Sequence, residues 1–138
     1  TAILPLLNGV NHDATIKQIL PDTEVWNGCV FIVARLIEAG LVKVDSEIKL
    51  LQFGSLKGNV EKLKKFESLL KEAEINAELS EDIEKTVWEK FIFISSLATI
   101  TSFADANIGG VLASAEHQKL LIELIAEVSQ LAKAKKVN

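Results

Sequence analysis

Cysteine, methionine and tyrosine are scarce or missing in this sequence. Its 138 residues include one cysteine, Cys29, and neither methionine nor tyrosine. A single cysteine excludes an internal disulfide framework and fits a reducing compartment, so we expect a cytoplasmic protein. One cysteine and two histidines, His12 and His117, are also too few for a metal site without many carboxylates at suitable spacing. We therefore expect no bound metal.

The lack of methionine also means that the sequence has no initiator residue. The chain opens directly in an apolar, strand-like run and stops just after a predicted helix. We therefore expect it to be an internal part of a longer protein. The opening residues 1–7, TAILPLL, lack a basic region and a cleavage-like end, so they do not form a signal peptide.

Positive charge is in short supply as well. The net charge is −4, and no run of lysines and arginines is interleaved with aromatic residues, so no nucleic-acid surface is expected. The uncharged run at residues 91–104 is shorter than the ~20 apolar residues that a membrane-spanning helix needs. It also carries three serines and two threonines. A buried helix is the better interpretation, and we expect no membrane partner.

The composition that remains is that of a folded protein. Hydrophobic residues make up 49% and charged residues 25% of the chain, which is ordinary for globular proteins and wrong for disorder. The length is enough for a real hydrophobic core. The sequence thus predicts an ordered chain with a packed interior.

The first half of the sequence alternates between strand and helix patterns. Residues 2–7 predict a buried strand that ends at an Asn8-Gly9 turn, and residues 12–20 predict a helix ended by Pro21-Asp22. Residues 24–53 predict two or three antiparallel strands, separated at Ala39-Gly40 and Asp45-Ser46. An amphipathic helix is predicted for residues 59–74, and a short strand or extended link for 75–80.

The second half is mostly helical. Ser80 is a good candidate for the N-cap of a helix that runs to about Phe103. Gly109-Gly110 is expected to break the chain before a last long helix at residues 117–136. We therefore predict an α/β part, residues 1–79, followed by a helical part, residues 80–138.

Few residues suggest chemistry by type and spacing. No GxGxxG, P-loop or GxSxG pattern occurs, and Cys29, in a strand-like run, is better explained by packing than as a nucleophile. His12 and His117 are most simply exposed polar residues. A solvated helix start explains the acidic residues Glu81, Asp82, Glu84 and Glu89 without catalysis.

Lys90 is the harder case, because it stands immediately before the uncharged run. Its aliphatic stem could cover apolar surface while the ammonium reaches water. Alternatively, the ammonium could lie in a cleft of low dielectric, where it donates a proton or holds a carboxylate. Residue type and spacing leave both interpretations open. Ile94 and Ala98, four and eight residues later, share its helix face.

Several stretches, in this order, resemble the ketopantoate reductase (2-dehydropantoate 2-reductase) family. ILPLLNGV (3–10) resembles that family's apolar strand followed by an NG motif. GCVFIVARLIEAGLVKV (28–44) and IKLLQFGS (48–55) resemble the end of its nucleotide-binding domain. ELSEDIEKTVWEKFIF (78–93) resembles its acidic helix start, and the most specific part is Asp82-Ile83 with Trp88-x-Lys90. The resemblance covers nearly the whole chain.

The resemblance implies a function for the parent protein. It would be an NADPH-dependent reductase of 2-oxo acids, most simply of 2-dehydropantoate in pantothenate and coenzyme A biosynthesis. Residues 1–79 would be the C-terminal part of a Rossmann-type nucleotide-binding domain, and residues 80–138 the first part of a helical substrate and dimerisation domain. Lys90 matches the catalytic lysine, which also binds substrate, and Asn8 matches the asparagine beside nicotinamide and substrate. A homodimer is among the expected partners.

Two features depart from this pattern. This chain lacks the family's Gly-rich dinucleotide loop. It also lacks a late serine and glutamate motif that helps to hold substrate in that family. We therefore expect this chain alone to be inactive. Typical members also carry asparagines four and eight residues after the lysine, where this sequence has Ile94 and Ala98. The alternatives are therefore a divergent member that reduces another oxo acid or only binds nucleotide, and a non-catalytic domain that uses the 91–104 helix as a partner surface.

Overall fold

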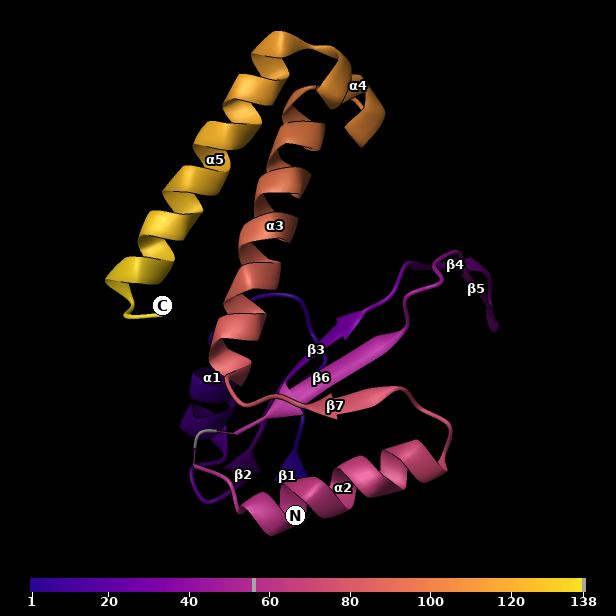
Figure 1. Ribbon diagram of the computed structural model, residues 1–138, viewed down its shortest axis with the longest axis vertical. Coiled ribbons are helices and arrows are strands. Elements are labelled where there is room, and N and C mark those ends of the chain that lie inside the picture. The colour runs from indigo at the N-terminus through magenta and orange to yellow at the C-terminus, as the bar shows by residue number, and fades with distance from the viewer. Residues whose placement is uncertain (56, 138) are drawn as a thin grey trace. The chain divides into compact units, whose positions relative to one another are not determined.

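A computed structural model describes residues 1–55 and 57–137 of the chain. The chain divides into two compact units, Thr1–Thr86 and Val87–Asn138. The first unit combines strands and helices, and the second contains helices (Figure 1). The predicted order, an α/β part followed by a helical part, is confirmed. No helix among the described residues combines the length and apolarity needed to cross a membrane.

The first unit opens with a short parallel strand pair around a helix. Strand β1, Ala2–Ile3, pairs in parallel with β2, Glu24–Val25, and helix α1, His12–Ile19, lies between them in sequence. The helix was predicted correctly. The strand predicted at residues 2–7 is confirmed only at Ala2–Ile3, and its predicted length and burial were wrong, because Leu6 and Leu7 lie beyond it with exposed side chains. Pro5 offers no backbone N–H for strand pairing, which suits an early end to this strand.

A three-stranded sheet forms the centre of this unit. Strand β3, Asn27–Phe31, is antiparallel to β6, Leu50–Gly54, and β6 is parallel to β7, Ala77–Leu79. Between β3 and β6 the chain makes a separate antiparallel hairpin of β4, Ala34–Glu38, and β5, Leu41–Val44. The predicted antiparallel pairing and the break after Glu38 are therefore confirmed, but the described residues form four such strands, β3 to β6, and not two or three. The parallel pairing of β6 with β7 was not predicted.

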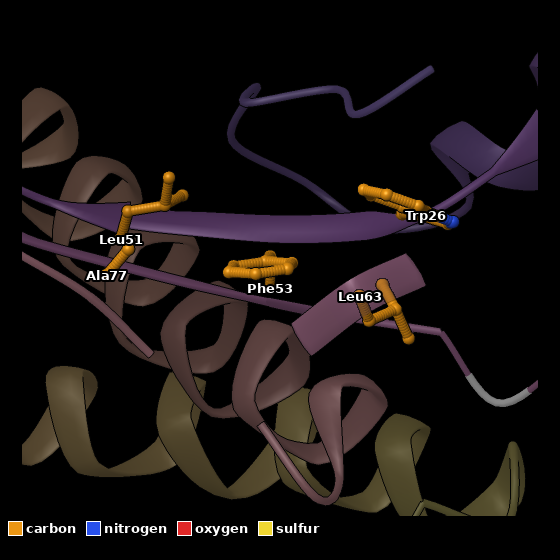
Figure 2. Packing of buried hydrophobic residues seen from close by; sticks show 5 residues of the cluster. All are labelled: Trp26, Leu51, Phe53, Leu63 and Ala77. Carbon is orange, nitrogen blue, oxygen red and sulfur yellow. The ribbon is translucent and has the colours of Figure 1, made fainter. Parts of the chain in front are cut away.

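Helix α2, Val60–Glu72, packs against this sheet and completes the core. Asn59 caps the helix, since its side-chain oxygen accepts a hydrogen bond from the backbone N–H of Lys62 at 3.1 Å. The buried cluster is shown in Figure 2 and consists of Trp26, Leu51, Phe53, Leu63 and Ala77. The ring of Phe66 packs edge-on to that of Phe53, with centroids 5.3 Å apart. Aromatic packing between sheet and helix thus holds the first unit together.

Two carboxylates fasten α2 to neighbouring strands. Glu24 accepts hydrogen bonds from the ammonium of Lys62 and from the indole N–H of Trp26, and these lower its pKa. Glu67 accepts from the backbone N–H of Leu79 at 3.0 Å and pairs with Lys71 at 3.0 Å. These contacts, the backbone hydrogen bond first, lower the pKa of Glu67.

Helix α3, Ile83–Phe103, ends where the sequence predicted. The predicted N-cap, Ser80, was wrong. The backbone N–H of Ser80 is used by the sheet, where it donates to the carbonyl of Phe53 at 2.8 Å. Asp82 caps the helix instead, because its side-chain oxygen accepts from the backbone N–H of Lys85 at 3.1 Å.

The chain break predicted at Gly109-Gly110 was also wrong. Both glycines lie within helix α4, Ile108–Ala113, where the side chain of Asn107 accepts from the backbone N–H of Gly110 at 3.0 Å. This cap offsets the poor helix propensity of the glycines. The last helix, α5, Ala115–Ala134, begins two residues earlier than predicted, because Ser114 caps it by accepting from the N–H of His117.

Candidate active site

Lys90 lies in the second turn of α3, on regular helix. Its side chain is partly buried, and the neighbouring Trp88 is 6% exposed. The Trp88 ring meets the ring of Phe91 edge-on, with centroids 5.7 Å apart. Because the helical hydrogen bonds fix the backbone on both sides of Lys90, the direction of its Cα–Cβ bond follows from the helix itself.

The helix face that Lys90 occupies is apolar further along. Uninterrupted α3 places Ile94 and Ala98 one and two turns after Lys90, with Ile94 partly buried and Ala98 exposed. No carboxamide stands at either position. The face beyond Lys90 therefore offers methyl groups and aliphatic surface to anything that binds there.

The hydroxyl groups of this helix do not replace the missing carboxamides. Those of Ser95, Thr99 and Thr101 each donate to the backbone carbonyl four residues earlier, at 2.6, 2.8 and 2.8 Å. Ser96 is 1% exposed, and its hydroxyl makes no hydrogen bond within the described residues. The hydroxyls of these four residues are thus used by the helix or buried.

Asn8 lies in the loop between β1 and α1, in the first unit. Its side chain is exposed, and within the described part of the chain no hydrogen bond to its carboxamide is found. The loop continues with Gly9 at φ 114° and Asn11 at φ 69°. The predicted turn at Asn8-Gly9 is confirmed as a tight bend with left-handed backbone. Asn8 belongs to the first unit and Lys90 to the second.

Packing or solvation explains the cysteine and the acidic residues that the sequence analysis considered. Cys29 is 4% exposed in β3, as expected for a packing residue. The four acidic residues near the start of α3 are exposed, as expected for a solvated helix start. Among residues 1–55 and 57–137, no group of three histidine, cysteine or acidic side chains is placed to hold a metal ion.

The two histidines are less exposed than predicted. The ring of His12 is partly buried, and its Nε2 lies 3.1 Å from the backbone carbonyl oxygen of Asn8. His117 is also partly buried, and its Nδ1 makes no hydrogen bond within the described residues. The contact between His12 and Asn8 was missed from sequence. In the sequence, this contact could have been suggested by the spacing of Asn8 and His12, which lie four residues apart across a predicted turn.

Two family models match the chain. The model described as ketopantoate reductase PanE/ApbA matches residues 1–58, and the one described as ketopantoate reductase PanE/ApbA C terminal matches residues 82–138. A 2-dehydropantoate 2-reductase from Lactococcus lactis subsp. lactis (strain IL1403) is 25% identical over 140 residues, with 100% of this chain and 44% of the relative covered.

Solved structures agree with these matches. The crystal structure of 2-dehydropantoate 2-reductase from Porphyromonas gingivalis W83 is 38% identical with a TM-score of 0.88, covering 100% of this chain and 48% of that one. The complex of D-mandelate dehydrogenase with NADH also gives a TM-score of 0.88, at 23% identity and 46% coverage of that chain, which shows a shared fold alone.

The chain spans less than half the length of these relatives. The predicted fold, the end of a Rossmann-type domain followed by the start of a helical domain, matches the architecture of these structures. Both models that match describe the same enzyme family, and together they cover most of the chain. The chain belongs to the ketopantoate reductase family.

Proposed function

We propose that the protein containing this chain is an NADPH-dependent reductase of 2-oxo acids, with 2-dehydropantoate as its substrate and pantoate as its product. The observation that carries the proposal is Lys90. It lies on α3 beside buried Trp88, inside the residues matched by the C-terminal family model. Residues 1–79 would then close a Rossmann-type domain, and residues 80–138 would open the helical domain.

The role proposed for Lys90 follows from the charge that develops in carbonyl reduction. When NADPH is bound, it supplies a hydride to the ketone carbon, and negative charge grows on the ketone oxygen. The ammonium of Lys90 would stabilise that oxygen electrostatically and then transfer a proton to it, which completes the alcohol and leaves a neutral amine. Solvent returns the proton to Lys90 after product release.

Asn8 would orient the reacting groups. A carboxamide offers both a donor and an acceptor, which suits the amide of a nicotinamide ring or the carboxylate of a 2-oxo acid. The exposed carboxamide of Asn8 has this capacity available, since it makes no hydrogen bond within the described residues. This chain has no Gly-rich phosphate loop, so its own residues fit the nicotinamide end of the cofactor and not the pyrophosphate.

Replacing Lys90 tests the proposal. In the complete natural protein, Lys90→Ala should lower kcat by about 10²–10⁴-fold, because a positioned general acid contributes about that much. Lys85→Ala is the matched control, since Lys85 is an exposed lysine on the same helix. The variant's far-UV circular dichroism should be unchanged. If Lys90→Ala retained a near-normal kcat, the assignment of the proton donor would be wrong.

The apolar face beyond Lys90 supports a second candidate, a reductase of another 2-oxo acid. Ile94 and Ala98 stand where the family resemblance leads us to expect asparagines, whose carboxamides would suit a polar substrate such as 2-dehydropantoate. An aliphatic wall favours a substrate with an apolar side chain, because buried polar groups of the substrate would lack partners there. A panel of 2-oxo acids with side chains of increasing apolar area distinguishes the two candidates.

The double variant Ile94→Asn/Ala98→Asn sharpens this test. If the natural substrate is an apolar 2-oxo acid, the variant should improve kcat/KM for 2-dehydropantoate by about 30-fold and lower it for the apolar acid, since two new hydrogen bonds contribute about 1 kcal/mol each. Thr99→Asn, exposed on another face of α3, is the control. Efficient reduction of 2-dehydropantoate by the unmodified protein would exclude the second candidate.

A homodimer and a cytoplasmic location are part of the same proposal. Phe93 and Phe103 of α3 are exposed, and exposed aromatic side chains on one helix suit a protein partner. The single cysteine, Cys29, supports a reducing compartment. Sedimentation equilibrium of the natural protein measures the oligomeric state, and a monomer at all concentrations would contradict the dimer.

A further inference from the structure

The loop that carries Asn8 is closed by one side chain. His12, the first residue of α1, reaches back across Gly9, Val10 and Asn11, and its Nε2 lies 3.1 Å from the backbone carbonyl oxygen of Asn8. A carbonyl oxygen can only accept a hydrogen bond, so Nε2 carries the proton and donates it. Among the described residues, this is the one hydrogen bond found to Asn8.

The ring of His12 also packs against the turn that it closes. Gly9 has φ 114°, in the region where a side chain is strained. A Cβ atom at Gly9 would lie 3.2 Å from Nε2 and 3.5 Å from Cε1 of His12. The ring therefore occupies the space that the glycine leaves open, and turn and imidazole fit one another.

The far end of the loop is fastened separately. The carbonyl of Asn11 accepts from the backbone N–H of Thr15 at 3.1 Å and from its hydroxyl at 3.2 Å. Asn11 is thus part of the first turn of α1. Asn8, three residues earlier, depends on the imidazole of His12 for its link to the helix.

Holding the carbonyl of Asn8 limits the direction of its side chain. The backbone carbonyl carbon and Cβ are both bonded to Cα, so fixing the peptide plane restricts rotation about ψ and with it the direction of the Cα–Cβ bond, from which the carboxamide extends. We propose that His12 is a positioning residue that aims the carboxamide of Asn8 at the nicotinamide or substrate. The inference rests on the proposed function, because it needs Asn8 to contact a ligand.

Two substitutions separate the hydrogen bond from the packing. His12→Gln keeps an N–H donor, because Nε2 of glutamine is the same number of bonds from Cα as Nε2 of histidine. His12→Phe keeps an aromatic ring against Gly9 and removes the donor. In the complete natural protein, His12→Phe should lower kcat/KM for reduction by about tenfold or more, as expected for a misplaced orienting group. His12→Gln should restore it to within about threefold of the unmodified enzyme.

A double-mutant cycle with Asn8→Ala identifies the route of the effect. If His12 acts through Asn8, His12→Phe should have no further effect on kcat/KM in the Asn8→Ala background. Equal effects of His12→Phe in both backgrounds would overturn the inference. If Asn8→Ala alone left kcat/KM unchanged, the proposed role of Asn8 would fail. If Asn8→Ala lowered kcat/KM and His12→Phe did not, the inference about His12 alone would fail.

A spectroscopic measurement needs no variant. Long-range ¹H–¹⁵N correlation spectra of the natural protein, at a pH where the imidazole is neutral, report which nitrogen of His12 is protonated. The hydrogen bond to Asn8 requires the Nε2–H tautomer. A dominant Nδ1–H tautomer would contradict the contact and overturn the inference, even if His12→Phe failed to fold.

Discussion

The two units of the chain bury their apolar residues in different ways. In the first unit, a continuous cluster joins the sheet to α2, with Phe53 completely buried at its centre. In the second unit, the buried apolar residues among those described are few and belong to different helices: Trp88 and Ile100 in α3, Val111 in α4 and Ala132 in α5. Large apolar side chains remain exposed in both units, among them Leu36 and Val42 in the first and Phe103 and Ile122 in the second. Apolar sequence therefore predicts that an element forms, but not that it is covered.

The two proposed functional residues differ in what holds their backbone in place. Lys90 lies on a regular helix, whose backbone hydrogen bonds fix the direction of its Cα–Cβ bond. Asn8 lies in an irregular loop, and a side chain, His12, holds it in place. A single substitution outside Asn8 can therefore disturb the backbone at Asn8, whereas the backbone at Lys90 is held by the hydrogen bonds of α3.

The largest change in stability is expected at Phe53, and the matching substitution at Phe103 shows how buried and exposed phenylalanines differ. Phe53→Ala should lower the free energy of unfolding by about 3–5 kcal/mol, because it leaves a cavity in the aromatic cluster. Phe103→Ala removes the same atoms from a side chain that is 73% exposed, so it should change the free energy of unfolding by no more than about 0.5 kcal/mol. Urea unfolding followed by far-UV circular dichroism measures both.

Fluorescence can assign the Phe53 effect to its unit. In a Trp88→Phe background, the signal of Trp26 reports the first unit alone, since the Trp26 ring stacks on Phe53 with centroids 6.3 Å apart. Comparable losses from the two alanine variants would show that the exposed face of α3 is covered in solution. That result would contradict the difference in burial between Phe53 and Phe103.

A smaller effect is expected from Glu67, which links α2 to β7 within the first unit. Its pKa is lowered by the hydrogen bond from the backbone N–H of Leu79 and by Lys71. The ionised form is thus favoured in the folded state, so its contribution is complete above the unfolded pKa of about 4.3 and disappears as the pH falls through the folded pKa.

Glu67→Gln tests this contribution. The variant keeps an acceptor for Leu79 but loses the charge, so at neutral pH it should be less stable by under about 1 kcal/mol. The difference from the unmodified protein should shrink as the pH falls below about 4. Glu61→Gln, an exposed residue of the same helix, is the control. A difference that stayed constant with pH would place the effect in packing and not in charge.

Much of the fold could be predicted from the sequence because the relevant signals are local. The spacing of apolar residues predicted α1, α2 and α5, and Phe103 was correctly predicted as the end of α3. The errors occurred where a local rule met a distant contact. Ser80 has the residue type of an N-cap, but its backbone pairs with Phe53 in the sheet, so the helix starts later.

The candidate site could be predicted only in part. Lys90 and Asn8 were selected by their resemblance to a family motif, and their catalytic roles stay predictions. The apolar face formed by Ile94 and Ala98 followed from helical spacing, and α3 is a continuous helix there. The role of His12 was not predicted, since the hydrogen bond depends on the backbone of Gly9 and Asn11.

The sequence by itself determined most of the helices and strands, the faces of those helices and the family, because these depend on periodicity and on short motifs. Only the tertiary structure decided that Phe53 is buried while Phe103 is exposed, and that the ring of His12 reaches the carbonyl of Asn8. The physical reason is that burial and side-chain hydrogen bonds depend on which groups approach in space. Residues of the same type can therefore meet different environments, as these two phenylalanines do.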